Sequence, residues 1–211
     1  MLDSWRLIET PKLPAEENMQ IDRELFSSYK EEKRSIFRLY EWEEGFSYGV
    51  NQDISKIDVD FGFYSAKRLT GGGVLLHGHD ISYTIITKAD RGVKKSYEYW
   101  CGFLFDFYKM LGLNPSFAKD LGGLEFGRDE FCQIGFEPYD IIIEGKKIGG
   151  NAQKHTKDAI LQHGSIPIKK IVHPLAGYSL VDLGIEIDEF EAREMLKYAF
   201  CKRYNIRFLD E

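Results

Sequence analysis

The chain has 211 residues, of which 43% are hydrophobic, and a formal net charge of −6. A chain of this length and apolar content can bury a substantial core, so we expect one domain over residues 1–211. Because acids outnumber bases along the chain, we expect no nucleic-acid partner, since phosphate-backbone binding normally requires a basic face.

Two further features indicate a cytoplasmic protein. The three cysteines, Cys101, Cys132 and Cys201, are widely spaced and form no CxxC pattern, which is typical of reduced thiols. The N-terminus has no basic start followed by an apolar segment, and no apolar run is long enough to span a bilayer. We therefore expect neither a signal peptide nor a membrane partner.

The N-terminal half of the sequence predicts a helix, a strand and a second helix. AEENMQIDRELFSSYK (15–30) has helical spacing, and SIFRLYEW (35–42) alternates apolar and polar residues as a strand does. VDFGFYSAKR (59–68) is an extended segment that leads to three glycines, and SYEYWCGFLFDFYKMLG (96–112) is a helix that Gly112 ends. The expected buried face of the first helix consists of Met19, Ile21, Leu25, Phe26 and Tyr29.

The C-terminal half predicts two strands joined by a turn, a further strand and a last helix. Residues 139–144 are β-branched and aromatic, Gly145 makes a turn, and another strand covers 159–168. Asp188 is the expected N-cap of a helix over 188–204, because Glu191 follows three residues later as in a capping box. The expected buried face of this helix is Phe190, Met195, Leu196, Ala199 and Phe200.

Hairpins that alternate with separate helices indicate an α+β fold with a mixed β-sheet flanked by helices. The regular βαβ alternation of a doubly wound fold is missing. The glycine-rich stretch RLTGGGVLLHGHDISYT (68–84) matches neither a phosphate loop, G-x-x-x-x-G-K-[ST], nor the G-x-G-x-x-G of a dinucleotide site.

The pair His77 and His79 has the spacing that places two imidazoles on one face of a strand, where they could hold zinc. No cysteine or carboxylate pair with ligand spacing accompanies them, so we expect no metal site. Cys132 lies in GRDEFCQIGFEPYD (127–140), a polar, glycine-containing stretch just before a strand. We expect a loop near the sheet edge, and loops on rigid scaffolds commonly present reactive groups.

Two blocks of the sequence carry a resemblance to a known family. The first is the glycine stretch at 68–84, and the second is YDIIIEGKKIGGNAQKHTKDAILQHGSIPI (139–168). Together they resemble the lipoate–protein ligase and octanoyltransferase superfamily, whose fold is shared with biotin–protein ligases. The opening SWRLIETPKLPAEENMQIDREL (4–25) is similar to the start of that family. The resemblance implies a single catalytic domain of the biotin/lipoyl ligase type over 1–211, without a C-terminal accessory domain.

The resemblance also implies roles for particular residues. Lys147 corresponds to the lysine of the fold, which would hold the acyl carbonyl or the accepting amine. His77 would help to line an acyl pocket, and bare glycine backbone would pack against a thin acyl chain. The remaining substrate-binding positions implied are Arg68, Gly71, Gly72, Gly73, Gly149, Gly150, Asn151, Ala152, His163 and Gly164.

Two enzyme classes use this scaffold. A ligase activates free lipoate with ATP and Mg²⁺ and then acylates a target lysine, whereas a transferase carries an octanoyl or lipoyl group on its own cysteine without a cofactor. Cys132 favours the transferase, since it lies 15 residues before Lys147, as the catalytic cysteine does in octanoyltransferases and amidotransferases of Gram-positive bacteria. We expect a lowered pKa for its thiol, caused by Lys147 or a nearby histidine.

At some positions the sequence resembles the ligase motifs more than those of the transferases. Gly73 is the ligase-like third glycine, Lys67–Arg68 replaces the usual double arginine, and Gln133 follows Cys132 where phenylalanine is common. A third alternative is a non-catalytic protein that binds lipoate or lipoyl domains. The resemblance implies a monomer that acts on lipoyl-domain proteins, such as glycine cleavage H protein or 2-oxoacid dehydrogenase E2, with acyl carrier protein as a possible donor.

Overall fold

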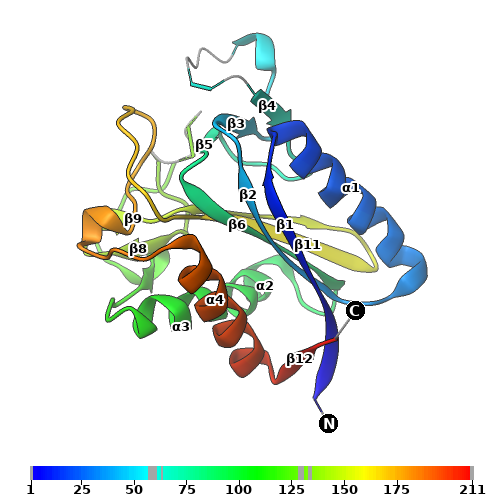
Figure 1. The fold of residues 1–211 in the computed structure, drawn as a ribbon. Helices are drawn as coiled ribbons and strands as arrows, with labels where there is room; N and C mark the ends of the chain where they lie inside the picture. Colours follow the sequence, from blue (N-terminus) through cyan, green and yellow to red (C-terminus); the bar gives the residue numbers. More distant parts are fainter. Residues whose placement is uncertain (1, 57–60, 63, 128–130, 133–134, 210–211) are drawn as a thin grey trace.

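A six-stranded mixed sheet runs through the molecule (Figure 1). The computed structural model describes residues 2–56, 61–62, 64–127, 131–132 and 135–209. The strand β1 pairs in parallel with β2 and β12, and the other neighbouring strands pair antiparallel. In sheet order the strands are β10 (Gly150–His155), β11 (Ala159–Pro167), β6 (Asp80–Lys88), β2 (Ile36–Trp42), β1 (Asp3–Leu13) and β12 (Ile206–Phe208).

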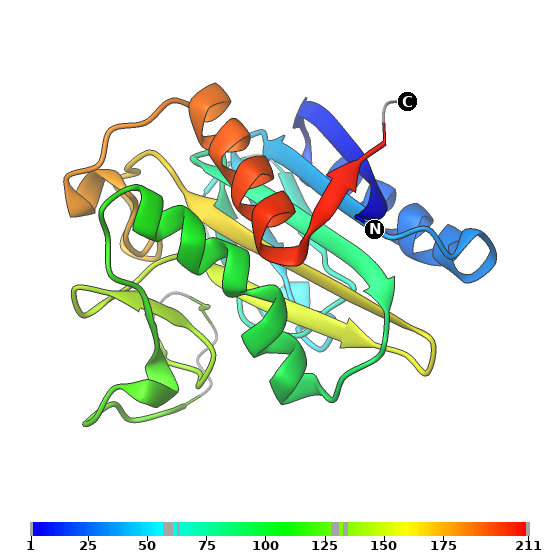
Figure 2. The ribbon, with the colours of Figure 1, turned by 90° about the horizontal axis from the view of Figure 1, so that it is seen from below.

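Helices cover both faces of this sheet. Helix α1 lies on one face, while α2, α3 and α4 lie on the other, as the two views of the ribbon show (Figures 1 and 2). The mixed sheet and its flanking helices confirm the expected α+β class. The helices are α1 (Ala15–Glu32), α2 (Val93–Trp100), α3 (Gly102–Met110) and α4 (Glu189–Tyr204), with short 3₁₀ turns η1 (Ile54–Lys56), η2 (Ala118–Asp120) and η3 (Val181–Leu183).

Two three-stranded sheets complete the described architecture. The first is β4–β3–β5, made by Tyr64–Lys67, Gly45–Tyr48 and Leu75–His77, and the second is β7–β8–β9, made by Ser116–Phe117, Ile141–Ile143 and Lys146–Lys147. The turn between β8 and β9 has positive φ at both central residues, 51° at Glu144 and 74° at Gly145. That is the geometry of the tight two-residue hairpin turn, so the turn expected at Gly145 is confirmed.

Alternation along the strands gives the main sheet one apolar and one polar face, because successive side chains point to opposite sides. Phe37 and Tyr83 belong to the large core shared with α2, α3 and α4, and Phe37 stacks on Phe200 of α4 with ring centroids 4.0 Å apart. On the opposite face lie buried polar side chains. They are Arg38, Tyr40, Ser82, Thr84, His163 and Ser165.

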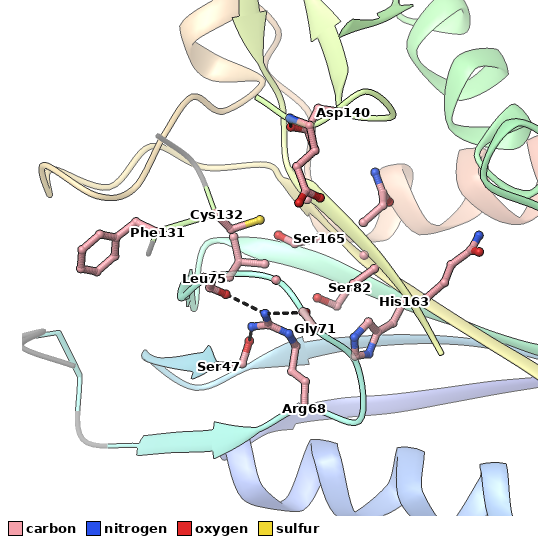
Figure 3. Close-up of a pocket in the computed structure, with 18 of the residues that line it drawn as sticks. Ser47, Arg68, Gly71, Leu75, Ser82, Phe131, Cys132, Asp140, His163 and Ser165 are labelled. Carbon is pink, nitrogen blue, oxygen red and sulfur yellow. Dashed lines mark hydrogen bonds between the residues drawn. The ribbon is translucent and has the colours of Figure 1, made fainter. Parts of the chain in front are cut away.

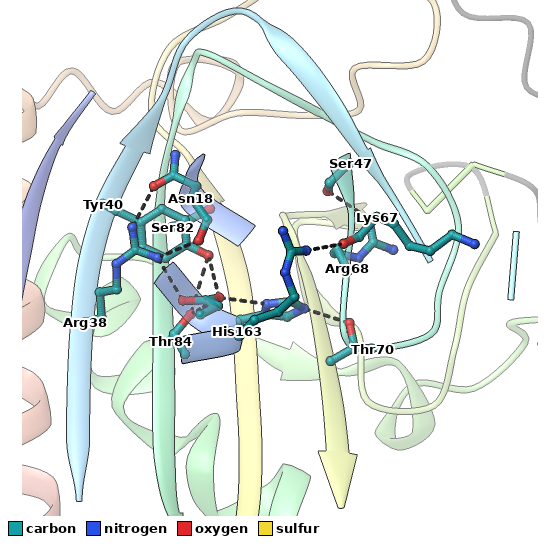
Figure 4. Close-up of polar contacts among 12 residues, drawn as sticks. Asn18, Arg38, Tyr40, Ser47, Lys67, Arg68, Thr70, Ser82, Thr84 and His163 are labelled. Carbon is teal, nitrogen blue, oxygen red and sulfur yellow. Dashed lines mark hydrogen bonds and ion pairs between the residues drawn. The ribbon is translucent and has the colours of Figure 1, made fainter. Parts of the chain in front are cut away.

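Helix α1 seals part of the polar face through a buried ion pair. The guanidinium of Arg38 donates to Asp22 Oδ1 at 2.8 Å and to Asn18 Oδ1 at 2.6 Å, and the hydroxyl of Thr84 donates to Asp22 Oδ2 at 2.8 Å (Figure 4). Burial alone would raise the pKa of Asp22, but its contacts with His163, Arg38 and Thr84 outweigh burial and lower it. Where α1 covers the polar face, the two terminal nitrogens of Arg38 are therefore paired, and its Nε has no hydrogen-bond partner among the described residues.

Two sequence predictions about helices are wrong in detail. The single helix expected over 96–112 is two helices, α2 and α3, separated at Cys101. Arg203 of α4 packs so closely on Gly102 that a Cβ there would lie 2.8 Å from its Nε, and its guanidinium donates to the Gly102 carbonyl. In α4, Asp188 does cap Glu191 N–H, but Phe190 is 74% exposed.

The exposure of Phe190 follows from helical geometry. The buried positions of α4 are Ala192, Leu196, Ala199 and Phe200, and Phe190 lies about 240° around the helix from Leu196. Of the extended segment expected over 59–68, residues 64–67 form β4, and residues 59–60 and 63 lie outside the described residues. None of the helices described is long and apolar enough to cross a membrane.

Candidate functional site

A cavity of about 430 Å³ opens on the polar face of the main sheet, between the glycine turn, the β8–β9 hairpin and the segment that carries Cys132 (Figure 3). Its volume lies within the ~300–1,000 Å³ typical of small-molecule sites. Twelve of the thirteen residues singled out from the sequence line it. They are Arg68, Gly71, Gly72, Gly73, His77, Cys132, Lys147, Gly150, Asn151, Ala152, His163 and Gly164.

The glycine turn is held from inside by Arg68. Its guanidinium donates to the carbonyl of Gly73 at 2.6 Å, to that of Gly71 at 3.2 Å and to the hydroxyl of Ser47 at 2.8 Å. Gly72 adopts a φ of 94°, which favours glycine, and a Cβ there would lie 3.2 Å from the same guanidinium. The bare backbone thus lets the turn wrap around Arg68, a structural reason for the glycines beside the expected packing on a substrate.

Two buried histidines fix the floor of the cavity. His77 contacts Ser47 Oγ at 2.8 Å through Nε2 and Asp80 Oδ2 at 2.9 Å through Nδ1, and its ring stacks on Trp42 at 3.8 Å. His163 contacts Thr70 of the glycine turn at 2.7 Å (Figure 4). Burial alone would raise the pKa of Asp80, but its contacts with His77 outweigh burial and lower the pKa.

The zinc pair considered for His77 and His79 does not have the expected geometry. Strand β5 ends at His77, and Gly78 turns the chain with a φ of 109° before β6 begins at Asp80, so the two histidines do not share a strand face. Across the described residues, no group of three or more His, Cys, Asp or Glu side chains could hold a metal ion.

The backbone of Cys132 is hydrogen-bonded to both of the sequence blocks described above. Its N–H donates to the carbonyl of Val74, just after the glycine turn, at 2.9 Å, and its carbonyl accepts from Lys147 Nζ. Its sulfur lies against the edge strand β10, where a Cβ added to Gly150 would be 3.0 Å from Sγ. The expected loop over the sheet edge is found for the described part of 127–140; residues 128–130 and 133–134 lie outside it.

Lys147 has three acceptors around its ammonium group. These are the carbonyls of Cys132 and of Gly135, the latter at 2.9 Å, and the carboxylate of Asp140 at 2.6 Å. A lysine ammonium has three N–H donors. Lys147 therefore clamps the Cys132 segment to the β8–β9 hairpin in this state, rather than presenting a free donor to the cavity.

The thiol of Cys132 differs from the sequence expectation. Burial raises its pKa above the ordinary value, Asp140 and Glu137 act in the same direction, and the positive charges of Lys147 and Arg68 oppose them without prevailing. The expected lowered pKa is therefore wrong for this state. The main reason is burial of the thiol, which outweighs the lowering effect of Lys147, while the carboxylate of Asp140 beside that lysine also raises the pKa.

Gly149 is the one predicted site residue that is not among those lining the cavity. Its φ is 69°, and a Cβ there would lie 2.0 Å from the carbonyl oxygen of Ser165 on β11. Gly149 therefore allows β10 to approach β11, and the acyl-binding role expected for it has no geometric support here.

We expect Gly149→Ala to destabilise the fold by about 1–3 kcal/mol more than Gly145→Ala. Gly145 has a similar φ of 74° but no atom within 4 Å of an added Cβ, so it isolates the conformational cost of about 1–2 kcal/mol. Urea unfolding of the two variants measures the difference. Equal free energies of unfolding would show that the contact with Ser165 relaxes at no cost.

Among the lining residues that were not singled out from the sequence, Asp140 and Ser165 bear on the chemistry of the cavity. Asp140 pairs with Lys147, and Ser165 is a buried hydroxyl, 3% exposed, that lies near enough to Asp80 to help lower the pKa of that carboxyl. Both lie inside the second sequence block, at its second residue and directly after His163–Gly164. Their position in the block was the available signal, but their chemistry depends on contacts that only the fold brings together.

Comparison with known proteins agrees with this geometry. Residues 14–180 match the family model of the lipoyl protein ligase A/B catalytic domain. The octanoyltransferase LipM of Bacillus cereus is 32% identical over 186 residues, which is 79% of this chain and 66% of that relative, so the chain spans slightly less than two thirds of its length.

Solved structures agree on the fold. A lipoate–protein ligase A bound with ATP superposes with a TM-score of 0.79 over 100% of this chain and 89% of that one, at 21% identity. A putative lipoate protein ligase from T. acidophilum with bound lipoic acid gives 0.78 over 99% and 88%, also at 21% identity. The expected fold is confirmed, and the chain belongs to the lipoyl protein ligase A/B catalytic domain family.

Proposed function

We propose that this protein is an acyltransferase that carries an octanoyl or lipoyl group as a thioester on Cys132 and passes it to a lysine of a lipoyl-domain protein. The observation that carries the proposal is the placement of Cys132. Its sulfur lies against Gly150 in the cavity, while its backbone is held by Val74 on one side and Lys147 on the other.

The chemistry proceeds by two exchanges. The sulfur of Cys132 attacks the carbonyl of an acyl thioester, and the carrier thiol leaves; the amine of the acceptor lysine then attacks the new thioester and releases Cys132. Ser165 lines the cavity opposite Gly150 on the β10–β11 strand pair, next to the Cys132 sulfur, so its hydroxyl is the group we propose to donate to the acyl carbonyl oxygen.

Relatives support the transferase over the ligase. The octanoyltransferase LipM of Bacillus cereus is about one-third identical to this chain, whereas the superposed ligases are less similar and support the fold alone. A transferase needs no ATP, because the donor thioester is already activated.

The proposed acceptor is a lipoyl domain such as that of glycine cleavage H protein or an E2 subunit, and the proposed donor is acyl carrier protein. The free thiols of Cys101, Cys132 and Cys201 support a reducing compartment, the cytoplasm.

Intact-mass measurement after mixing the protein with octanoyl acyl carrier protein tests this function. We expect the protein itself to gain one octanoyl group without ATP, and to lose it when a lipoyl domain is added. Formation of lipoyl-adenylate from ATP and free lipoate would indicate a ligase instead. If neither product forms, the protein binds its ligand without chemistry.

A further inference from the structure

The cavity extends around the edge of the six-stranded sheet. Strand β10 forms this edge, and its successive side chains point to opposite faces. Gly150 belongs to the polar face, whereas Asn151 and Gln153 belong to the face that α2, α3 and α4 cover. Asn151, Gln153 and Tyr97 of α2 nevertheless line the cavity. Part of the cavity therefore lies on the α2 side of β10, and we call this part, lined by Tyr97, Asn151 and Gln153, the α2 branch.

The α2 branch begins next to the sulfur of Cys132. A Cβ added to Gly150 would lie 3.0 Å from this sulfur, and Asn151 is the next residue along β10. On the polar face, the glycine turn 71–73 and Leu75 line the rest of the cavity. A thioester bound at the sulfur has two arms, the acyl chain and the carrier that holds the thiol. If the glycine turn receives the acyl chain, the α2 branch is the space that remains for the carrier.

The side chains of the α2 branch suit a neutral polar ligand. They are two carboxamides and a phenol, and the ring of Tyr97 is fixed by its stack on Tyr139 with centroids 5.3 Å apart. A carboxamide offers both N–H donors and a carbonyl acceptor, which match a secondary amide and have no counterpart in an acyl chain. The phosphopantetheine arm of acyl carrier protein contains such an amide, separated from its thiol sulfur by an ethylene link.

Tyr83 holds the carboxamide of Asn151 in one orientation. The hydroxyl of Tyr83 donates to Asn151 Oδ1 at 2.7 Å and accepts from Gln162 Nε2 at 2.7 Å. A phenol has a single proton, so Tyr83 donates to Asn151 alone. Asn151 Nδ2 has no acceptor among the described residues. Its N–H groups are therefore available to a ligand in the α2 branch.

Gly164 provides the space for this contact. It lies between Asn151 and Tyr83 on neighbouring strands, and a Cβ there would be 2.2 Å from Asn151 Oδ1 and 2.7 Å from Tyr83 Cε1. Any larger residue would separate the two side chains. Gln162 is fixed in turn by Gln153, whose amide nitrogen donates to Gln162 Oε1. The orientation of Asn151 thus depends on a chain of side chains beneath β10 and β11.

We infer that the α2 branch binds the amide-containing arm of the thioester donor, and that Asn151 Nδ2 donates to the carbonyl of the amide nearest the sulfur. Tyr83 is then a positioning residue, which acts through Asn151. The inference rests on the proposed function, since that function supplies the thioester. No bond forms or breaks in the branch. Its contribution is to hold the reacting carbon–sulfur bond beside Cys132, where orientation lowers the barrier to attack.

Two small thioesters test this site. Octanoyl-N-acetylcysteamine contains the amide nearest the sulfur, and S-pentyl thiooctanoate has an equally long arm with methylenes in its place. Intact mass gives the rate at which each acylates the protein. We expect the wild type to react about 10-fold faster with the amide thioester, the worth of one neutral hydrogen bond. In Asn151→Ala the two rates should become equal.

Tyr83→Phe tests the positioning role. We expect the preference for the amide thioester to fall to about 3-fold, because the carboxamide of Asn151 is still present but no longer oriented. The rate with S-pentyl thiooctanoate should not change, and it reports any structural damage separately. Combined with Asn151→Ala, the Tyr83 change should have no further effect on the preference.

Tyr204→Phe is the matched control. It removes a hydroxyl that donates to the carbonyl of Tyr99 at 2.6 Å, beside the same core but outside the cavity, so both rates should match the wild type. Equal rates of the wild type with the two thioesters overturn the inference, and this comparison needs no variant to fold. A preference that persists in Asn151→Ala also overturns it. If neither these thioesters nor octanoyl acyl carrier protein acylates the wild type, the proposed function itself is wrong.

Discussion

Replacing Cys132 by serine is expected to abolish both self-acylation and acyl transfer. A serine hydroxyl in the same position is a far weaker nucleophile, and an ester formed on it would be less reactive toward an amine than a thioester. The fold should persist, because Cys132 is partly exposed and its anchoring contacts to Val74 and Lys147 are made by its backbone. Intact mass and a lipoyl-domain acylation assay measure the effect.

Cys201→Ser is the matched control for that variant. Cys201 is half-buried on α4 and does not line the cavity, so the change should leave self-acylation at the wild-type rate. If Cys132→Ser still lipoylates a target domain when it is supplied with ATP and free lipoate, the protein is a ligase and the thioester does not exist.

Lys147→Ala is expected to reduce acyl transfer by about 100-fold, because the change releases the Cys132 segment from the β8–β9 hairpin and a misplacement of the reacting group by about 1 Å can cost that much. The change frees the carbonyls of Cys132 and Gly135 and leaves Asp140 buried without a counter-charge. Breaking one side of a buried pair also costs about 3–5 kcal/mol of stability, a cost that protonation of Asp140 reduces. Transfer rates should therefore be measured well below the unfolding temperature of the variant, together with urea unfolding.

Lys146→Ala is the control within the same strand. Lys146 points the other way, donates to the carbonyl of Asp182 at 2.9 Å and lies over Tyr178, outside the cavity. We expect near-normal transfer for this variant. Near-normal transfer for Lys147→Ala as well would remove Lys147 from the mechanism and show that the Cys132 segment holds its position unaided.

The sequence was sufficient to predict the features of the fold that depend on residues only a few positions apart. The N-cap of α4 is predictable because Asp188 and the N–H of Glu191 are three residues apart, and the β8–β9 turn because Gly145 tolerates positive φ. Phe190 shows the limit of composition alone. Phe190 is apolar and lies on a helix. However, Asp188 determines where the helix begins, and the position of Phe190 two residues later faces solvent rather than the core.

The interior of the site could not be predicted in the same way. Asn18 and Asp22 belong to the buried face of α1. From the sequence alone, polar residues on an amphipathic helix are expected to face solvent, and only the structure shows that Arg38 of β2 binds both of them. Asp140 is likewise an ordinary acid in the sequence. Its relation to Lys147 and Cys132 arises only when the β8–β9 hairpin and the glycine turn meet the same segment of chain.

The way in which Cys132 is attached bears on how such enzymes diversify. Cys132, the proposed nucleophile, lies outside the six-stranded sheet, on a stretch of chain held by the carbonyl of Val74 and the ammonium of Lys147. Both fasteners contact main-chain atoms, so they would hold any amino acid at that position equally well. A substitution at this position would therefore add or remove the thiol without changing either contact, so that the presence of the thiol and the shape of the cavity are set independently.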